Sequence, residues 1–175
     1  MSDKLKQFKL LIVLFLFLLA IPSYFAYNHF RQSSTLKEAF EKNERIEVLQ
    51  HLMASGKYAS DIRKAGYVVP PDGAIRLDGG IDSIEIKGDI DLKISNPGRN
   101  EVTVLFETTV KEEKIDVYYI LDNRLTIKRS YYSNISNQKI KESVDISQAE
   151  EERLLKIVQK ELGAFMEKMY QTLYG

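Results

Sequence analysis

Two carboxylates at alternate positions are the first residues in this chain whose type and spacing could do chemistry. Asp89 and Asp91 lie in the stretch GDIDLKIS. In a strand, residues two apart point to the same face, so the two side chains could share a cation. Lys87 and Lys93 continue the same alternation and offset the charge. We therefore interpret the stretch as a solvated strand face rather than a metal site.

The remaining residues that could carry catalysis are few. The chain has two histidines, His29 and His51, and no cysteine, which excludes disulfides, thiolate metal sites and thiol catalysis. Neither histidine shares a recognisable spacing with a nucleophile or with metal-ligating carboxylates. The stretch from Asp78 to Ser83, DGGIDS, has the composition of a calcium loop but lacks the ligand spacing of an EF-hand. We expect a protein that is not an enzyme and binds no metal or cofactor.

An aromatic hairpin face is the strongest candidate site. Strict alternation over residues 115–132 places Tyr118, Ile120 and Tyr132 on one outward face together with Lys128. Exposed tyrosines beside a lysine are typical of protein-recognition surfaces. We predict that these four residues bind another protein. The alternative is that the tyrosines only support β structure or are covered by another part of the chain.

The elements that must hold this face are strands. From Ala74 onward the apolar period changes from 3.6 to 2, which predicts an antiparallel meander of about five strands. We expect KEEK (residues 111–114) to be a four-residue loop. A three-residue loop at 122–124 would pair Leu121 with Leu125 and Tyr119 with Ile127.

Two capping boxes predict helices on either side of the strands. Thr35 with Glu38 would start a helix that runs to about Ser55, with a bend or partial burial because its apolar stripes are out of phase. Ser147 with Glu150 would start a long C-terminal amphipathic helix, whose broad apolar face needs the sheet as its partner. The fold class is therefore α+β, a two-layer domain with helices packed on one face of the sheet.

The N-terminal region predicts a membrane anchor. Leu10 to Tyr27 is an uncharged run of 18 residues, close to the roughly 20 needed to span a bilayer core as a helix. Lysines 4, 6 and 9 precede it, which favours the N-terminus inside the cell and the rest outside. Cleavage after Ala20, Ser23 or Ala26 would leave a bulky residue at the −3 position, so we favour a retained signal-anchor over a cleaved signal peptide.

This anchor divides the chain in two. We expect residues 1–31 to be the transmembrane segment and residues 32–175 to be an extracytoplasmic domain. Four of the 25 basic residues and one of the 25 acidic residues precede Gln32, so the domain carries a net charge of about −3. A basic footprint for nucleic acid is absent.

The order of these segments resembles that of known membrane-anchored domains. An anchor and a short helix are followed by KGDIDLKISNPGRNEVTVLFETTVKEEKIDVYYI, with Gly88 and Gly98 in turns. This is similar to the single-pass domains related to the cytochrome oxidase assembly factor 1 and to the small accessory subunit of the inner-membrane translocase. The resemblance implies a non-catalytic accessory that binds another membrane protein. The chain also looks like small membrane-anchored immunity proteins of Gram-positive bacteria.

We therefore expect a bacterial, single-pass cell-membrane protein whose extracytoplasmic domain binds a protein partner. The first hypothesis is an accessory or assembly factor of a membrane complex. The second is an inhibitor or immunity protein that neutralises a secreted toxin or hydrolase.

Overall fold

The computed structural model describes residues 35–70, 79–95, 100–134 and 144–175. The chain divides into two compact units, residues 1–38 and 39–175, and the second unit contains the sheet and the long C-terminal helix. The predicted membrane segment, Leu10 to Tyr27, lies outside the described residues. Within the described ranges, no helix combines the length and the apolar character that a membrane span requires.

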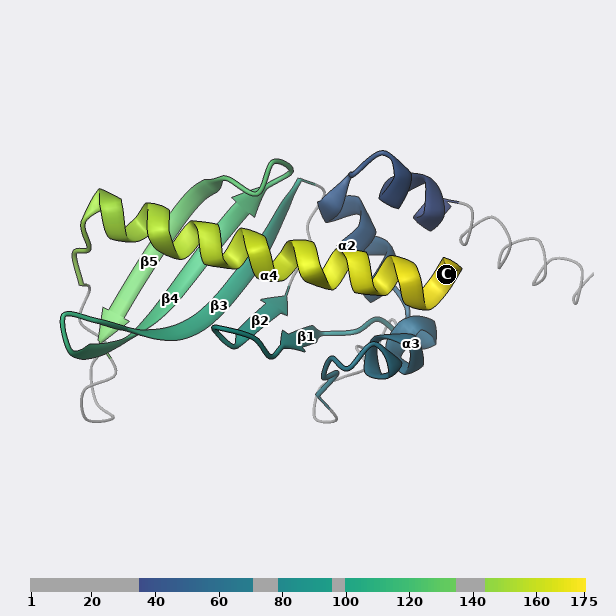
Figure 1. Ribbon diagram of the computed structural model, residues 1–175, viewed down its shortest axis with the longest axis horizontal. Coiled ribbons are helices and arrows are strands. Elements are labelled where there is room, and N and C mark those ends of the chain that lie inside the picture. Colours follow the sequence, from purple (N-terminus) through teal and green to yellow (C-terminus); the bar gives the residue numbers. More distant parts are fainter. Residues whose placement is uncertain (1–34, 71–78, 96–99, 135–143) are drawn as a thin grey trace, which may run out of the picture. The chain divides into compact units, whose positions relative to one another are not determined.

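The centre of the second unit is a five-stranded antiparallel meander in the order β1-β2-β3-β4-β5, which confirms the predicted sheet (Figure 1). Its strands are β1 (Ser83–Ile86), β2 (Leu92–Ser95), β3 (Glu101–Val110), β4 (Glu113–Asp122) and β5 (Ile127–Asn134). A single residue outside the strands, Val68, bridges to Glu85 on the free side of β1. Each strand follows its neighbour in sequence, so every connection in the sheet is local.

One face of the sheet forms the hydrophobic core. Opposed residues of antiparallel strands share a face, so the register groups side chains into rows that cross the sheet. One core row runs through Ile84, Ile94, Val104 and Tyr119, and all four side chains are fully buried. Phe106 packs edge-to-face on Tyr119, with ring centroids 5.5 Å apart. The alternation read from the sequence predicts these buried positions correctly.

The long helix α4 (Gln148–Tyr174) runs across the core face of the sheet (Figure 1). Its buried apolar residues follow the predicted stripe: Leu154, Val158, Leu162, Phe165, Met166 and Met169. The carboxylate-bearing Glu161 is buried as well. Half of the predicted capping box is present, because the Ser147 hydroxyl accepts a hydrogen bond from the Glu150 amide at 3.3 Å. The Glu150 carboxylate instead accepts two hydrogen bonds from Arg153. Helix α4 is therefore capped at its first turn and held to the sheet by its apolar stripe.

The helices before the sheet are shorter than the sequence predicts. Residues 35–41 are helical, and the chain then turns at Asn43, whose φ is +57°. Helix α2 (Arg45–Met53), the 3₁₀ turn η1 (Gly56–Tyr58) and helix α3 (Ala59–Lys64) follow. The expected bend is therefore a full break of the helix. Asparagine tolerates the left-handed region better than most residues, which explains why the break falls there.

The β3–β4 turn differs from the expected four-residue loop. Only Lys111 and Glu112 lie between the strands, and Val110 pairs with Glu113. Both turn residues have positive φ, at +51° and +69°. Two positive φ values are what a type I′ turn requires, and this turn matches the twist of the strands. The turn could not be predicted from the sequence, because neither position carries the Asn or Gly that is usual in a type I′ turn.

The β4–β5 connection also differs from the prediction. Strand β5 begins at Ile127, and Leu121 pairs with Ile127 rather than with Leu125. Leu125 has a φ of +56° and is fully buried, and its carbonyl accepts a hydrogen bond from Gln159 of α4 at 2.9 Å. The loop is therefore longer than three residues because it folds its own leucine inward against the helix.

Candidate functional site

The face of the sheet opposite α4, here called the outer face, carries a continuous row of side chains. The register links Glu85, Lys93, Leu105, Tyr118 and Tyr131 across all five strands. Each residue of this row is half-exposed or exposed, and Tyr131 is 56% exposed. The core row beside it is fully buried, so the two faces of the same strands have opposite environments.

The apolar part of the outer face lies over β3, β4 and β5. We call this group the outer-face patch: Leu105, Tyr118, Ile120 and Tyr131. Two of its members, Tyr118 and Ile120, were predicted from the sequence, and both are half-exposed. Leu105 could have been found, because it is an apolar residue at a polar position of the alternating β3 strand. The outward position of Tyr131 could not have been predicted from the sequence, because it depends on an irregularity in β5.

That irregularity is a β-bulge, which overturns the predicted position of Tyr132. Leu121 pairs with Ile127 and Ile120 pairs with Arg129, so Lys128 is an extra residue on β5. A bulge of this kind reverses the alternation that follows it. Tyr132 consequently pairs with Val117 on the core face, and Tyr131 takes the place on the outer face. The structure thus brings Tyr118, Ile120 and Lys128 together but places Tyr132 on the other side of the sheet.

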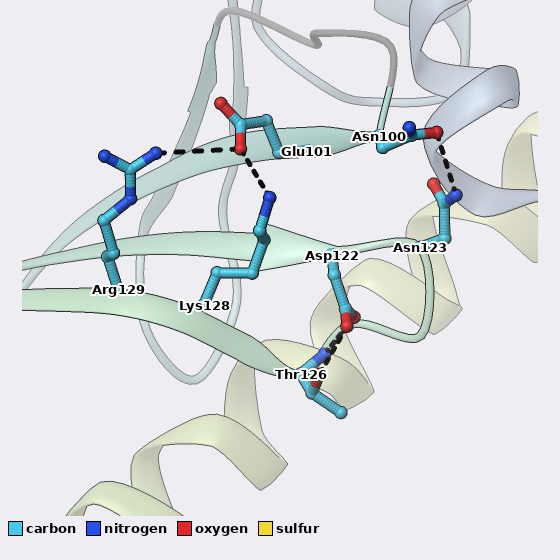
Figure 2. Close-up of polar contacts among 7 residues, drawn as sticks. All are labelled: Asn100, Glu101, Asp122, Asn123, Thr126, Lys128 and Arg129. Carbon is cyan, nitrogen blue, oxygen red and sulfur yellow. Dashed lines mark hydrogen bonds and ion pairs between the residues drawn. The ribbon is translucent and has the colours of Figure 1, made fainter.

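The bulge also brings two cations onto the outer face, as Figure 2 shows. The Lys128 ammonium lies 3.0 Å from the Glu101 carboxylate, and the Arg129 guanidinium lies 3.9 Å from the same oxygen. The hydrogen bond from Lys128 lowers the pKa of Glu101. Because two cations share one carboxylate, this cationic pair (Lys128 and Arg129) has an excess positive charge beside the patch.

The adjoining β4–β5 turn is built around Asp122 (Figure 2). Its carboxylate accepts hydrogen bonds from the amides of Arg124 and Thr126, both at 2.9 Å, and from the Thr126 hydroxyl at 2.7 Å. Hydrogen bonds from Thr126 are the main cause of the lowered pKa of Asp122. Asn123 reaches back to Asn100 at 3.3 Å. These contacts fix the loop from which β5 and its bulge start.

A charged groove occupies the other end of the outer face. Its volume is about 680 Å³, and it lies over β2 and β3, where Leu105 belongs to both the groove and the patch. Its lining includes five carboxylates: Glu85, Asp89, Asp91, Glu107 and Asp116. It includes only two lysines, Lys87 and Lys93, and Lys160 of α4 binds Asp89, so the carboxylates outnumber these three cations by two. The outer face therefore has an acidic end and a cationic end, separated by the apolar patch.

On the covered face, Tyr132 belongs to a hydrogen-bonded cluster with α4. Its hydroxyl donates to the Glu151 carboxylate, which also accepts a hydrogen bond from Ser130 at 2.9 Å. The Tyr119 hydroxyl lies 3.5 Å from that of Tyr132. Burial is the main cause of the raised pKa of Tyr119, and its hydrogen bond with Tyr132 raises it further. The pKa of Tyr132 is also raised, first by burial and then by the hydrogen bond to Glu151. This cluster joins β5 to the first turns of α4.

The residues considered for catalysis or metal binding have other partners. Asp89 binds Lys160 of α4 at 2.5 Å, and Asp91 binds Lys87 at 2.7 Å. His51 lies 3.6 Å from Glu47, one turn earlier in α2. Among the described residues, no group of three potential ligands is placed to hold a metal ion. His29 and Asp78, the first residue of the DGGIDS stretch, lie outside them, and Ser83 at its end begins strand β1.

A second hollow, of about 590 Å³, lies between residues 40–48 and the C-terminal part of α4. Its apolar lining comes from Phe40, Val48, Met166 and Tyr170. Phe40 contacts Tyr170 edge-to-face, with ring centroids 5.6 Å apart. The lining also contains polar and charged residues, namely Glu41, Asn43, Arg45, Glu167 and Gln171, so the hollow combines an apolar wall with polar groups.

The chain matches no protein-family model, and comparisons with curated proteins and with solved structures gave no significant match.

Proposed function

We propose that this chain is a membrane-anchored, non-enzymatic protein whose extracytoplasmic domain binds another protein through the outer face of its sheet. The observation that carries the proposal is the outer-face patch. Leu105, Tyr118, Ile120 and Tyr131 form a group of apolar side chains on the side of the sheet that α4 leaves open. Apolar groups gathered on a surface mark interaction sites more often than scattered ones do.

The composition of this surface is that of an interface. Tyrosine and arginine are enriched at the energetic centres of protein interfaces, where they combine apolar area with a polar tip. Tyr131 and Arg129 are both more than half exposed, at 56% for the residue and 57% for the side chain. Neither is needed to fill the core, because the other face of the sheet does that with α4. Their exposure leaves them available to a partner.

The predicted anchor would hold the domain close to the membrane. A domain tethered within a few residues of the bilayer has a raised effective concentration for partners in or at the membrane. We propose a single-pass cell-membrane protein with its C-terminal domain on the extracytoplasmic side, acting as an accessory or assembly factor of a membrane complex. An inhibitor of a secreted toxin would use the same face, and the identity of the bound protein separates the two roles.

Site-specific photo-cross-linking of the full chain tests the proposal. A benzophenone amino acid is placed at Tyr131 on the outer face or at Lys156, an exposed control position on α4, and membranes are irradiated. We expect an adduct of defined mass from position 131 and none of that mass from position 156. Equal adducts from both positions, or none from position 131, would contradict the proposal. A persistent integral-membrane partner indicates the accessory role, and a secreted toxin indicates the inhibitor.

A further inference from the structure

Resting on the proposed membrane location, we infer that the second hollow, between residues 40–48 and the C-terminal part of α4, is a phospholipid site. We call it the α4 hollow. An acyl chain lies against its apolar wall, and the head group meets the charged side chains of the same lining. Its volume of about 590 Å³ is in the usual range of small-molecule pockets. It shares no lining residue with the outer face, so it is separate from the proposed protein-binding surface.

A glycine inside α4 leaves space in this hollow. Gly163 lies in the interior of a helix of 27 residues, where glycine is less favourable than alanine. A Cβ added at this position would have no atom of the described chain within 4 Å, so close packing does not require the glycine. Gly163 instead lines the hollow. Glycine is typical of places where a backbone and a ligand come close together.

The apolar wall suits a hydrocarbon chain. Phe40 and Tyr170 meet edge-to-face, with ring centroids 5.6 Å apart, and Tyr170 is 36% exposed. Val48 of α2 and Met166 of α4 continue the wall. Methionine adapts its shape to irregular apolar partners. A chain bound here removes exposed aromatic surface from water, which favours binding.

The charge of Arg45 is available to a phosphate group. Arg45 is the first residue of α2 and lines the hollow. Its Nε donates to Asn43 Oδ1 at 3.1 Å, and the guanidinium forms no ion pair within the described part of the chain. A cation at the start of a helix opposes the helix dipole, so helix stability does not explain its position. Arginine binds phosphate oxygens through two parallel N–H groups.

The lining also carries an available negative charge. Glu167, one turn after Gly163 on α4, is exposed, and its carboxylate has no hydrogen bond or ion pair with another described residue. It repels a purely anionic head group and attracts an ammonium group beside the phosphate. The two charges, Arg45 and Glu167, therefore favour a zwitterionic head group such as phosphoethanolamine.

The predicted anchor makes the bilayer the source of this ligand. Phe40 follows Arg31, the last residue of the predicted transmembrane segment, by nine positions. Nine residues extend over at most roughly 32 Å, which limits the distance between the hollow and the end of the anchor. A tether this short raises the effective concentration of membrane lipid at the hollow.

Photolabelling of the full chain in vesicles tests the site. The vesicles are phosphatidylethanolamine with a trace of the same lipid that carries a diazirine in one acyl chain, and mass spectrometry identifies the labelled peptides. We expect adducts in residues 40–48 and 163–171. Gly163→Leu fills the hollow and should abolish these adducts without lowering the melting temperature, because leucine suits a helix better than glycine. Ala164→Leu, at the exposed neighbouring position, should leave them unchanged.

Two charge variants and a second probe test the head group. Arg45→Gln should lower labelling of the hollow by about tenfold, the factor for one lost hydrogen bond to a charged group, and Arg45→Lys should retain much of it. Glu167→Gln should raise labelling by a phosphatidylglycerol probe relative to the ethanolamine probe. A diazirine fatty acid that labels the hollow as strongly as the phospholipid would overturn the head-group assignment.

The outcomes separate this site from the proposed function. Adducts that are insensitive to Gly163→Leu or to Arg45→Gln, or that are lost equally with Ala164→Leu, overturn the lipid site. An unlabelled hollow with an intact protein adduct from position 131 overturns the lipid site and supports the proposed function. A labelled hollow without a protein adduct from position 131 has the opposite meaning. Absence of both overturns both.

Discussion

The two long hairpins of the sheet share strand β4 but differ in regularity. The β3–β4 hairpin pairs ten residues with ten, from Glu101 opposite Asp122 to Val110 opposite Glu113, without interruption. The β4–β5 hairpin loses register between Ile120 and Leu121, where Lys128 is the extra residue. The regular hairpin holds the core, and the irregular one shapes the surface.

The difference shows how one inserted residue can change which side chains reach the outer face, where we propose that a protein binds, while the core face stays packed. Before the bulge, Ile127 points towards the core beside Leu121. After it, Arg129 and Tyr131 point outward and Tyr132 points to α4. Bulges are known to re-aim side chains at functional edges of sheets. The extra residue, Lys128, is a cation on the outer face, and the reversed alternation after it turns the Tyr132 hydroxyl towards Glu151 of the helix.

The largest expected effect contrasts two neighbours on the shared strand. Tyr119→Ala should lower the free energy of unfolding by about 3–5 kcal/mol, the usual cost of emptying a large aromatic site in a core. Tyr118→Ala, on the outer face, should cost about 1 kcal/mol. Urea unfolding followed by circular dichroism measures both. Similar losses for the two variants would show that Tyr118 is also a core residue.

The next largest loss of stability is expected from a substitution that breaks the contact between the irregular β4–β5 hairpin and α4. Tyr132→Phe removes a hydrogen bond to a carboxylate, worth about 1.5–3 kcal/mol. The matched change Tyr131→Phe, one residue earlier on the other face, should be nearly neutral. If thermal unfolding shifts equally for both, the bulge does not separate the two tyrosines as described.

The same cluster predicts a loss of stability at high pH. The folded protein raises the pKa of Tyr119 and Tyr132 above the ordinary tyrosine value of about 10. Above that pH the unfolded chain ionises these groups while the folded chain keeps its protons, so stability is full below about pH 10 and falls as the pH rises. Tyr119→Phe should make the fall less steep in urea titrations between pH 9 and about pH 11. An unchanged slope would mean that the cluster does not contribute.

A smaller change in stability is expected when the turn of the regular β3–β4 hairpin is redesigned. Lys111 and Glu112 both occupy the left-handed region, which costs side-chain-bearing residues free energy. Lys111→Asn with Glu112→Gly should raise the free energy of unfolding by about 1 kcal/mol, because Asn-Gly suits a type I′ turn. Calorimetry should show a melting temperature several degrees higher. A fall in melting temperature would contradict the two-residue turn.

The smallest effect concerns the cationic pair. Lys128→Ala should change stability by no more than about 0.5 kcal/mol, because exposed ion pairs contribute little to folding. The same variant should reduce cross-linking at the outer face. A stability loss as large as that of Tyr132→Phe would assign Lys128 to the fold instead of to the surface.

The core and the C-terminal helix were predictable because they depend on repeating patterns, whereas the break at Asn43 in the first helix was not predicted. Alternation in β3 and β4 identifies Val104, Phe106 and Tyr119 as buried, and a period near 3.6 identifies the stripe of α4. Such patterns are averages over many residues, so a single exception does not change the conclusion.

The site was only partly predictable because a bulge is a single exception with a large consequence. Tyr118 and Ile120 lie on the regular strand, and their face follows from alternation. Tyr132 lies after Lys128, and one extra residue reverses every face beyond it. The sequence around Lys128 contains no Gly or Pro that would mark the bulge. Turns at Lys111 and Leu125 were missed for a similar reason, since neither has the residue type that positive φ favours.

Thiol labelling in native membranes tests most directly whether the outer face is covered by protein. Lys93→Cys lies on the outer face, and Lys156→Cys lies on the exposed side of α4. Each rate of maleimide labelling is divided by the rate measured for the same variant in urea. We expect the ratio for position 93 to be at least about tenfold below that for position 156, and to rise when Arg129→Glu is added. Equal ratios at the two positions would contradict the account.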